Sequence, residues 1–183
     1  MLHFLPNLIS LARLLAVPAT VWLILTYRYN SAFWLFVAAG VSDALDGYLA
    51  RRLDIGSEVG AYLDPLADKA LLTSVYVGLG YVGHMPAWLV ILVVFRDVLI
   101  IGGAMLYHLL TQRLTMQPLF VSKVNTAVQI MLAALVLAQL GFGLDSHGAD
   151  TMLGYVAAAT TVISGVAYIA VWGRRFVGRE ARR

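Results

Sequence analysis

Four aspartates lie inside stretches of this chain that are otherwise apolar enough to cross a bilayer: Asp43, Asp46, Asp64 and Asp68. In a helix, the first two would share a face about 140° wide with three further residues, Gly47, Ala50 and Arg51. On the following helix, Gly60 would share a face with the other two aspartates. Because residues 52–57 form only a short turn, the two polar faces are expected to meet as an antiparallel pair.

Carboxylates gathered in one membrane-embedded pocket repel one another and lose hydration, so they are tolerated only with bound cations. Ligand sets made only of oxygen favour hard divalent ions such as Mg²⁺ or Mn²⁺. Two such ions, with Arg51 and the room that Gly47 and Gly60 leave for close backbone approach, would suit a pyrophosphate. This region therefore predicts a site for two divalent cations and a pyrophosphate.

The complete spacing, D-x2-D-G-x2-A-R-x8-G-x3-D-x3-D, resembles the signature of the CDP-alcohol phosphotransferases, which are membrane enzymes of phospholipid synthesis. Eight specified residues at fixed offsets make this a specific signal. The alternative is a transporter or proton relay built from two transmembrane hairpin helices with buried acids. A transporter would distribute charged residues along a full crossing path, whereas here they cluster in one half of the predicted spans.

The composition indicates an integral membrane protein, because 61% of the residues are hydrophobic and only 13% are charged, against about 25% charged in soluble domains. We expect one all-α domain over residues 1–183, a bundle of transmembrane helices. Six apolar runs have spanning length, near residues 7–27, 31–51, 57–80, 86–108, 121–140 and 152–171. The last run carries no Asp, Glu, Lys, Arg or His and is expected to be scaffold.

Basic residues gather on one side of these spans and include five arginines among the last ten residues. The bias of basic residues towards the cytoplasm places both termini there. The aspartates then lie in the inner half of the membrane, in a cavity open to the cytosol. The first residues have neither the basic start of a secretory signal nor the Arg-rich pattern of a transit peptide, so the first span is expected to remain. These features fit a bacterial inner membrane.

The resemblance implies roles for individual residues. Asp43, Asp46 and Asp64 would be the principal metal ligands, and Asp68 would complete the set and act as the general base. The cytidine diphosphate would be held by Gly47, Ala50, Arg51 and Gly60. The stretch P-N-x-x-S-x-x-R is similar to the first helix of the family and adds Asn7 and Arg13 to that pocket. The alternative for Arg13 is that its side chain reaches the membrane interface.

Three basic residues are candidates for binding the phosphate of the acceptor: Arg96, Lys123 and Arg113. A guanidinium fits phosphate oxygens with two hydrogen bonds, which favours Arg96. The alternative is that Arg96 and Asp97 compensate each other and serve packing. A polar stripe follows at helical spacing and must face protein or water rather than lipid: Ser122, Asn125, Thr126 and Gln129.

Two stretches, F-R-D-V at 95–98 and F-V-S-K-V-N-T-A-V-Q at 120–129, resemble the eukaryotic-type cardiolipin synthases of this family. That resemblance implies direct transfer of a phosphatidyl group from CDP-diacylglycerol to phosphatidylglycerol, with release of CMP. The alternative within the family is a phosphatidylglycerophosphate synthase, whose acceptor is glycerol-3-phosphate. The expected partners are the two lipid substrates, the surrounding membrane lipids and a second copy of the chain, and no nucleic acid. Glycines such as Gly78 and Gly102 would allow close approach of helices at the interface with the second copy, and the alternative is that they serve packing within one chain.

Overall fold

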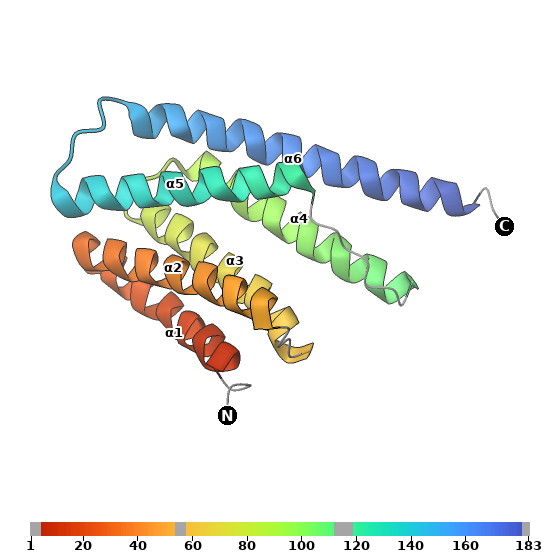
Figure 1. Ribbon diagram of the computed structural model, residues 1–183. Coiled ribbons are helices and arrows are strands. Elements are labelled where there is room, and N and C mark those ends of the chain that lie inside the picture. Colours follow the sequence, from red (N-terminus) through yellow and green to blue (C-terminus); the bar gives the residue numbers. More distant parts are fainter. Residues whose placement is uncertain (1–4, 54–57, 112–118, 181–183) are drawn as a thin grey trace. The chain divides into compact units, whose positions relative to one another are not determined.

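The computed structural model describes the backbone of residues 5–53, 58–111 and 119–180, and the side chains of residues 14–42, 69–103, 105 and 119–171. Within these ranges the chain forms helices and no strand, which confirms the predicted all-α class. Six helices follow one another in Figure 1: α1 (Leu5–Leu25), α2 (Tyr29–Leu53), α3 (Glu58–Tyr81), α4 (Ala87–Thr111), α5 (Phe120–Phe142) and α6 (Ala149–Glu180).

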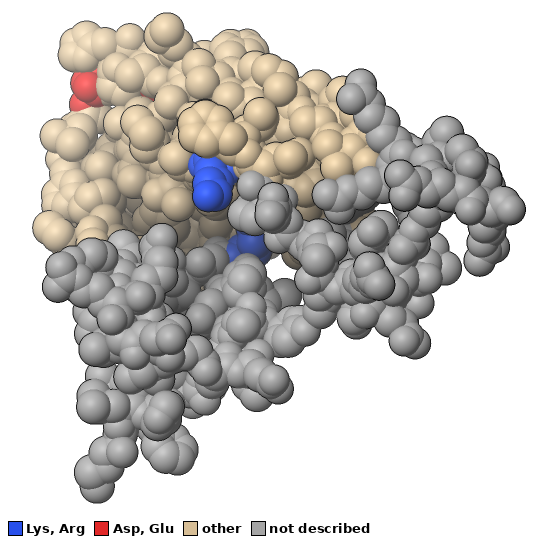
Figure 2. Space-filling model, turned by 45° about the vertical axis from the view of Figure 1, so that its right-hand side comes forward, with Lys and Arg blue, Asp and Glu red and all other residues tan. Residues whose placement is uncertain are grey.

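Two helical segments are long and apolar enough to cross a bilayer in the described part of the chain, Phe120–Phe142 and Ala149–Val171. The apolar described segment of α1, Leu14–Leu25, is shorter. Many large apolar side chains are exposed, among them Trp22, Ile91 and Tyr155. On the face shown in Figure 2, charged side chains occupy only a small part of the described surface. These features indicate a membrane protein, and the crossing of all six helices stays a prediction.

The helices belong to two compact units. One unit comprises Met1–Ala87 with Ala133–His147, and the other comprises Trp88–Leu132 with Gly148–Arg183. The first unit therefore holds α1, α2, α3 and the last part of α5. The second unit holds α4, the first part of α5 and α6. The single domain over residues 1–183 stays a prediction.

In the first unit, α1 and α3 end in the same way. After α1, the N–H of Arg28 donates to the carbonyl of Leu23 at 2.8 Å, and Tyr27 adopts a positive φ of 59°. After α3, the N–H of His84 donates to the carbonyl of Leu79 at 2.9 Å, and Gly83 has a φ of 84°. These bonds satisfy carbonyls that the last helical turn leaves open, and they reverse the chain sharply.

The connections that follow α1, α3 and α5 lie at one end of this unit. Nε2 of His84 lies 3.0 Å from the hydroxyl of Tyr29, which joins the beginning of α2 to the turn after α3. The ring of Phe142, at the end of α5, packs edge-on against Phe33 of α2 with centroids 5.3 Å apart. The end of α2 and the beginning of α3 therefore lie at the opposite end, because the two helices have nearly equal lengths of 25 and 24 residues.

The core of the first unit forms where α1 packs against α2 and α3. Ile24 of α1 and Tyr76 of α3 are fully buried. Gly78 leaves space for Ile24, whose methyl groups would lie 3.4 Å from a Cβ at position 78. Gly78 thus serves packing within the chain, which is one of the two roles that its small size predicted.

In the second unit, α4 and α6 run parallel and α5 runs antiparallel to both. Leu89 contacts α6 at Gly154, where a Cβ would lie 3.7 Å away, and Arg96 contacts α6 at Ser164. The residue numbers of the contacting pairs therefore increase together along α4 and α6, as they do in parallel helices. Ser122 of α5 and Ser164 of α6 both contact Arg96. Three residues later along α5, Asn125 contacts Thr161, which lies three residues earlier along α6, so these two helices are antiparallel.

Gly141 provides a test of this packing, because a Cβ there would lie 2.8 Å from the backbone nitrogen and Cα of Asn30. Since backbone atoms at the beginning of α2 have little freedom to move aside, Gly141→Ala should cost about 1–3 kcal/mol from overpacking, more than the gain of up to about 1 kcal/mol in helix propensity. We expect a lower thermal midpoint for the detergent-solubilised variant. Gly40→Ala is the control, because a Cβ there meets nothing within 4 Å, and its midpoint should not fall. Equal midpoints for the two variants would contradict this packing.

Candidate active site

The predicted metal ligands lie on α2 and α3, two helices of the first unit that follow one another along the chain. Asp43 and Asp46 belong to the last part of α2, and Asp64 and Asp68 belong to the first part of α3. Counting from Leu53 and Glu58, Asp46 and Asp64 are both about 10 Å from the helix ends, and Asp43 and Asp68 are both about 15 Å from them. The helix bounds therefore pair the four aspartates level by level, whereas their side chains lie outside the described residues.

The other residues predicted for the nucleotide also lie outside the described side chains: Asn7, Arg13, Gly47, Ala50, Arg51 and Gly60. Arg113 lies between α4 and α5, likewise outside the described residues. Among the side chains that are described, no group of three or more His, Asp or Glu lies close enough to hold a metal ion. The donor set on α2 and α3, four carboxylates and no sulfur or imidazole, fits hard divalent cations.

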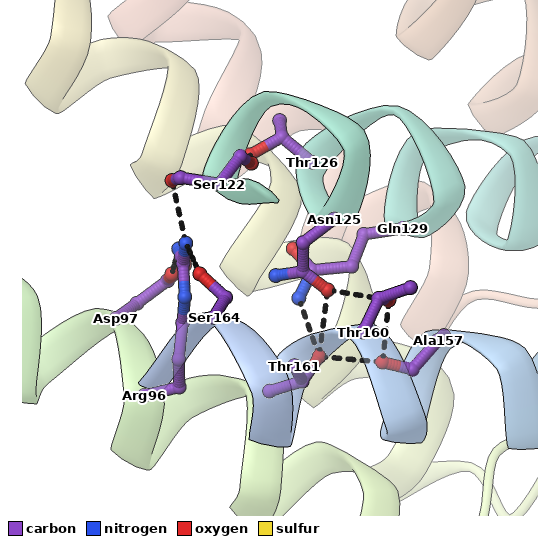
Figure 3. A network of polar contacts seen from close by, with 10 residues as sticks. All are labelled: Arg96, Asp97, Ser122, Asn125, Thr126, Gln129, Ala157, Thr160, Thr161 and Ser164. Atoms are coloured by element: carbon purple, nitrogen blue, oxygen red, sulfur yellow. Dashed lines mark hydrogen bonds and ion pairs between the residues drawn. The ribbon is translucent and has the colours of Figure 1, made fainter. Parts of the chain in front are cut away.

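Arg96 joins Asp97, Ser122 and Ser164 in one group of polar contacts (Figure 3). The residue is only 2% exposed, and its Nη1 donates to Oδ1 of the neighbouring Asp97 at 2.7 Å. Its Nη2 donates to two serine hydroxyls at 2.6 Å, one on Ser122 of α5 and the other on Ser164 of α6. One guanidinium thus connects α4, α5 and α6 of the second unit. Its pairing with Asp97 is the arrangement expected if the two charges compensate each other, which was the alternative to phosphate binding.

A second layer of polar contacts follows one helical turn further along α5. Oδ1 of Asn125 lies 2.9 Å from the hydroxyl oxygens of both Thr160 and Thr161 on α6. Nε2 of Gln129 donates to the same Thr161 at 3.2 Å. Asn125, Gln129 and Thr161 are fully buried, so the polar stripe on α5 faces protein, as its position in an apolar helix predicted.

Lys123 lies on the first turn of α5 and is exposed, between two residues of the buried stripe. That turn begins close to the level of Arg96, because Phe120 precedes Ser122 by only about 3 Å of helix. By contrast, α4 continues for about 22 Å beyond Arg96, and α6 for about 24 Å beyond Ser164. Figure 1 shows both helices extending past the beginning of α5. Lys123 is therefore set back from the ends of α4 and α6.

The polar contribution of α6 was not predicted from the sequence, in which this helix was expected to be scaffold. Thr160, Thr161 and Ser164 supply the partners of Asn125 and Arg96. The available signal was their spacing, since three hydroxyl side chains lie within five residues of an apolar helix. That signal is weak on its own, because a threonine hydroxyl in a helix also bonds its own backbone, as Thr161 does with the carbonyl of Ala157 at 2.6 Å.

Comparison with known proteins agrees with the motif on α2 and α3. The family model for CDP-alcohol phosphatidyltransferase matches residues 3–167. The chain is 38% identical, over 90% of its length, to "CDP-diacylglycerol--glycerol-3-phosphate 3-phosphatidyltransferase 1, chloroplastic" of Oryza sativa, of which it spans 55%. It is 35% identical, over 94% of its length, to "Cardiolipin synthase (CMP-forming)" of Homo sapiens, of which it spans 62%.

A third relative is matched over more of its own length. It is the "Probable phosphatidylglycerophosphate synthase" of Mycobacterium tuberculosis, at 34% identity over 91% of this chain and 80% of the relative. The chain thus spans less than two thirds of the rice and human proteins, and its similarity extends to proteins that bear two different activities in their names. Since the family model matches nearly the whole chain, this protein belongs to the CDP-alcohol phosphatidyltransferase family.

Proposed function

We propose that this protein transfers the phosphatidyl group of CDP-diacylglycerol to the headgroup hydroxyl of phosphatidylglycerol, giving cardiolipin and CMP. The observation that carries the proposal is the complete aspartate motif on α2 and α3 in a chain of this family. The equal levels of Asp46 and Asp64, and of Asp43 and Asp68, support one pocket between the two helices.

The proposed site faces the cytosol from the inner half of the membrane, with six spans and both termini on the cytosolic side. In the first unit, the connections after α1, α3 and α5 share one end, so the aspartates belong to the opposite half of α2 and α3. The basic residues near the end of α2, Arg51 and Arg52, favour the cytosol for that half. The bacterial inner membrane and the homodimer stay predictions.

In the proposed reaction, the acceptor oxygen forms a bond to the phosphorus that carries the diacylglycerol, and the bond from that phosphorus to CMP breaks. Asp68 takes the proton of the acceptor hydroxyl, as a general base on the same helix as Asp64. Arg51 binds the diphosphate, and Gly47 and Gly60 allow the close approach of the nucleotide. Two divalent cations held by the four aspartates would supply neutralisation of the diphosphate charge.

The choice of acceptor rests on Lys123 and the stretch around it. Phosphatidylglycerol carries one negative charge on a diester, whereas glycerol-3-phosphate brings a dianion that needs more cations near the metals. Lys123 is exposed and lies between Ser122 and Asn125 of the α5 stripe, and Arg113 precedes the same helix. The human relative, which is named a cardiolipin synthase, supports phosphatidylglycerol. The rice and mycobacterial relatives, which are named a glycerol-3-phosphate 3-phosphatidyltransferase and a phosphatidylglycerophosphate synthase, support the second candidate.

A competition assay decides between the two acceptors. Purified protein receives labelled CDP-diacylglycerol with phosphatidylglycerol, glycerol-3-phosphate or both, and the readout is CMP release together with the identity of the lipid product. We expect cardiolipin, with a rate that excess glycerol-3-phosphate barely lowers. Turnover with glycerol-3-phosphate and none with phosphatidylglycerol would assign the second candidate instead.

Replacing the aspartates tests the site itself. Asp43→Asn, Asp46→Asn and Asp64→Asn should each reduce CMP release to background, because each removes a charged oxygen ligand, and EDTA should do so reversibly. Asp68→Asn should lower turnover about 10²-fold or more while CDP-lipid binding remains. Asp145→Asn is the control, since that side chain is 80% exposed in the loop after α5, and it should keep full activity. Undiminished activity in EDTA would refute the metal site.

A further inference from the structure

Two of the three guanidinium nitrogens of Arg96, Nη1 and Nη2, already donate hydrogen bonds within the protein. A guanidinium donates hydrogen bonds to two phosphate oxygens along one of two edges, formed either by Nη1 and Nη2 or by Nε and Nη2. Both edges include Nη2, and Nη2 of Arg96 already donates to Ser122 and Ser164 at 2.6 Å. Its charge is also compensated by Asp97 at 2.7 Å. A phosphate bound with two hydrogen bonds would therefore have to displace a serine.

The same contacts give Arg96 a mechanical role. Ser122 is in the first turn of α5, and the next polar layer along that helix is Asn125 with Thr161. The hydrogen bond from Arg96 to Ser122 is therefore the polar contact nearest the beginning of α5, and it holds that first turn against α4 and α6. Lys123 directly follows Ser122 and is exposed, so the position of its ammonium group depends on how that first turn is held.

We propose that Arg96 is a positioning residue, which holds the first turn of α5 through Ser122 and so places Lys123 for the acceptor phosphate. This proposal rests on the function proposed above, in which Lys123 binds the acceptor. Nε of Arg96 is buried and has no hydrogen-bond partner among the described residues. A phosphate that used this atom would make a direct contact with Arg96, and the experiment must separate that contact from an indirect effect.

Three variants make the separation. Ser122→Ala removes the link to α5 and leaves Arg96 in place, Arg96→Lys keeps the charge and removes the fork, and the third variant combines both changes. If Arg96 acts through Ser122, each single variant should raise the KM for phosphatidylglycerol several-fold and leave the KM for CDP-diacylglycerol within about twofold. The double variant should be no worse than Arg96→Lys, because both changes break one link.

If Arg96 binds the phosphate directly, Ser122→Ala frees a donor on Nη2. The KM for phosphatidylglycerol would then stay unchanged or fall in that variant while Arg96→Lys raises it, and this result would overturn the proposal. Ser74→Ala is the matched control, since this serine is also partly buried in a helix and donates at 2.8 Å to the carbonyl of Leu71 in its own helix. It should leave both KM values unchanged.

A second readout does not depend on activity. Hydrogen–deuterium exchange of the amides in residues 122–129 should become several-fold faster in Ser122→Ala and in Arg96→Lys, because the first turn of α5 opens more often. It should not change in Ser74→Ala. Unchanged exchange in both test variants would overturn the positioning role. Absence of transfer to either acceptor in the unaltered protein would refute the proposed function alone, with the exchange result still standing.

Discussion

Compensation of buried charge is the constraint on which this structure depends. An ion in an apolar bundle is costly unless a partner and hydrogen bonds replace its hydration. The structure shows one solution at Arg96, which is 2% exposed and has Asp97 and two serines around it. For the four aspartates on α2 and α3, which carry the same sign, we propose divalent cations as the compensating charge.

The polar contacts of the two units differ in kind and in place. In the second unit, hydroxyl and amide side chains connect α5 to α6 inside an apolar surrounding, where polar contacts between helices substitute for a hydrophobic driving force. At the end of the first unit where the connections after α1, α3 and α5 lie, Tyr29 and His84 make a hydrogen bond, and the ring of Tyr27 packs edge-on against Tyr29. Amphipathic rings of this kind suit the level of lipid headgroups, which agrees with an interface at that end.

Much of the fold follows from hydropathy alone, and little of the site does. The run predicted at 121–140 forms a helix over Phe120–Phe142, and the α5 stripe faces protein as predicted. However, α6 continues to Glu180, past the predicted 171, because helix formation does not require the apolar residues that a spanning run does. The pair of Arg96 with Asp97 was one of the two predicted alternatives, but the two serine partners were not predicted, because Ser122 and Ser164 are 26 and 68 residues away along the chain.

Direct titration tests whether the aspartates on α2 and α3 hold divalent cations, without any assay of turnover. Mn²⁺ is added to the purified protein, and the free ion is measured by its paramagnetic resonance signal. We expect about two bound ions per chain, as in two-metal phosphoryl-transfer sites, which are lost when Asp43 and Asp64 are both replaced by Asn and retained in Asp145→Asn. Equal Mn²⁺ binding by the unaltered protein and the double variant, or no binding by either, would contradict a cation site at these aspartates.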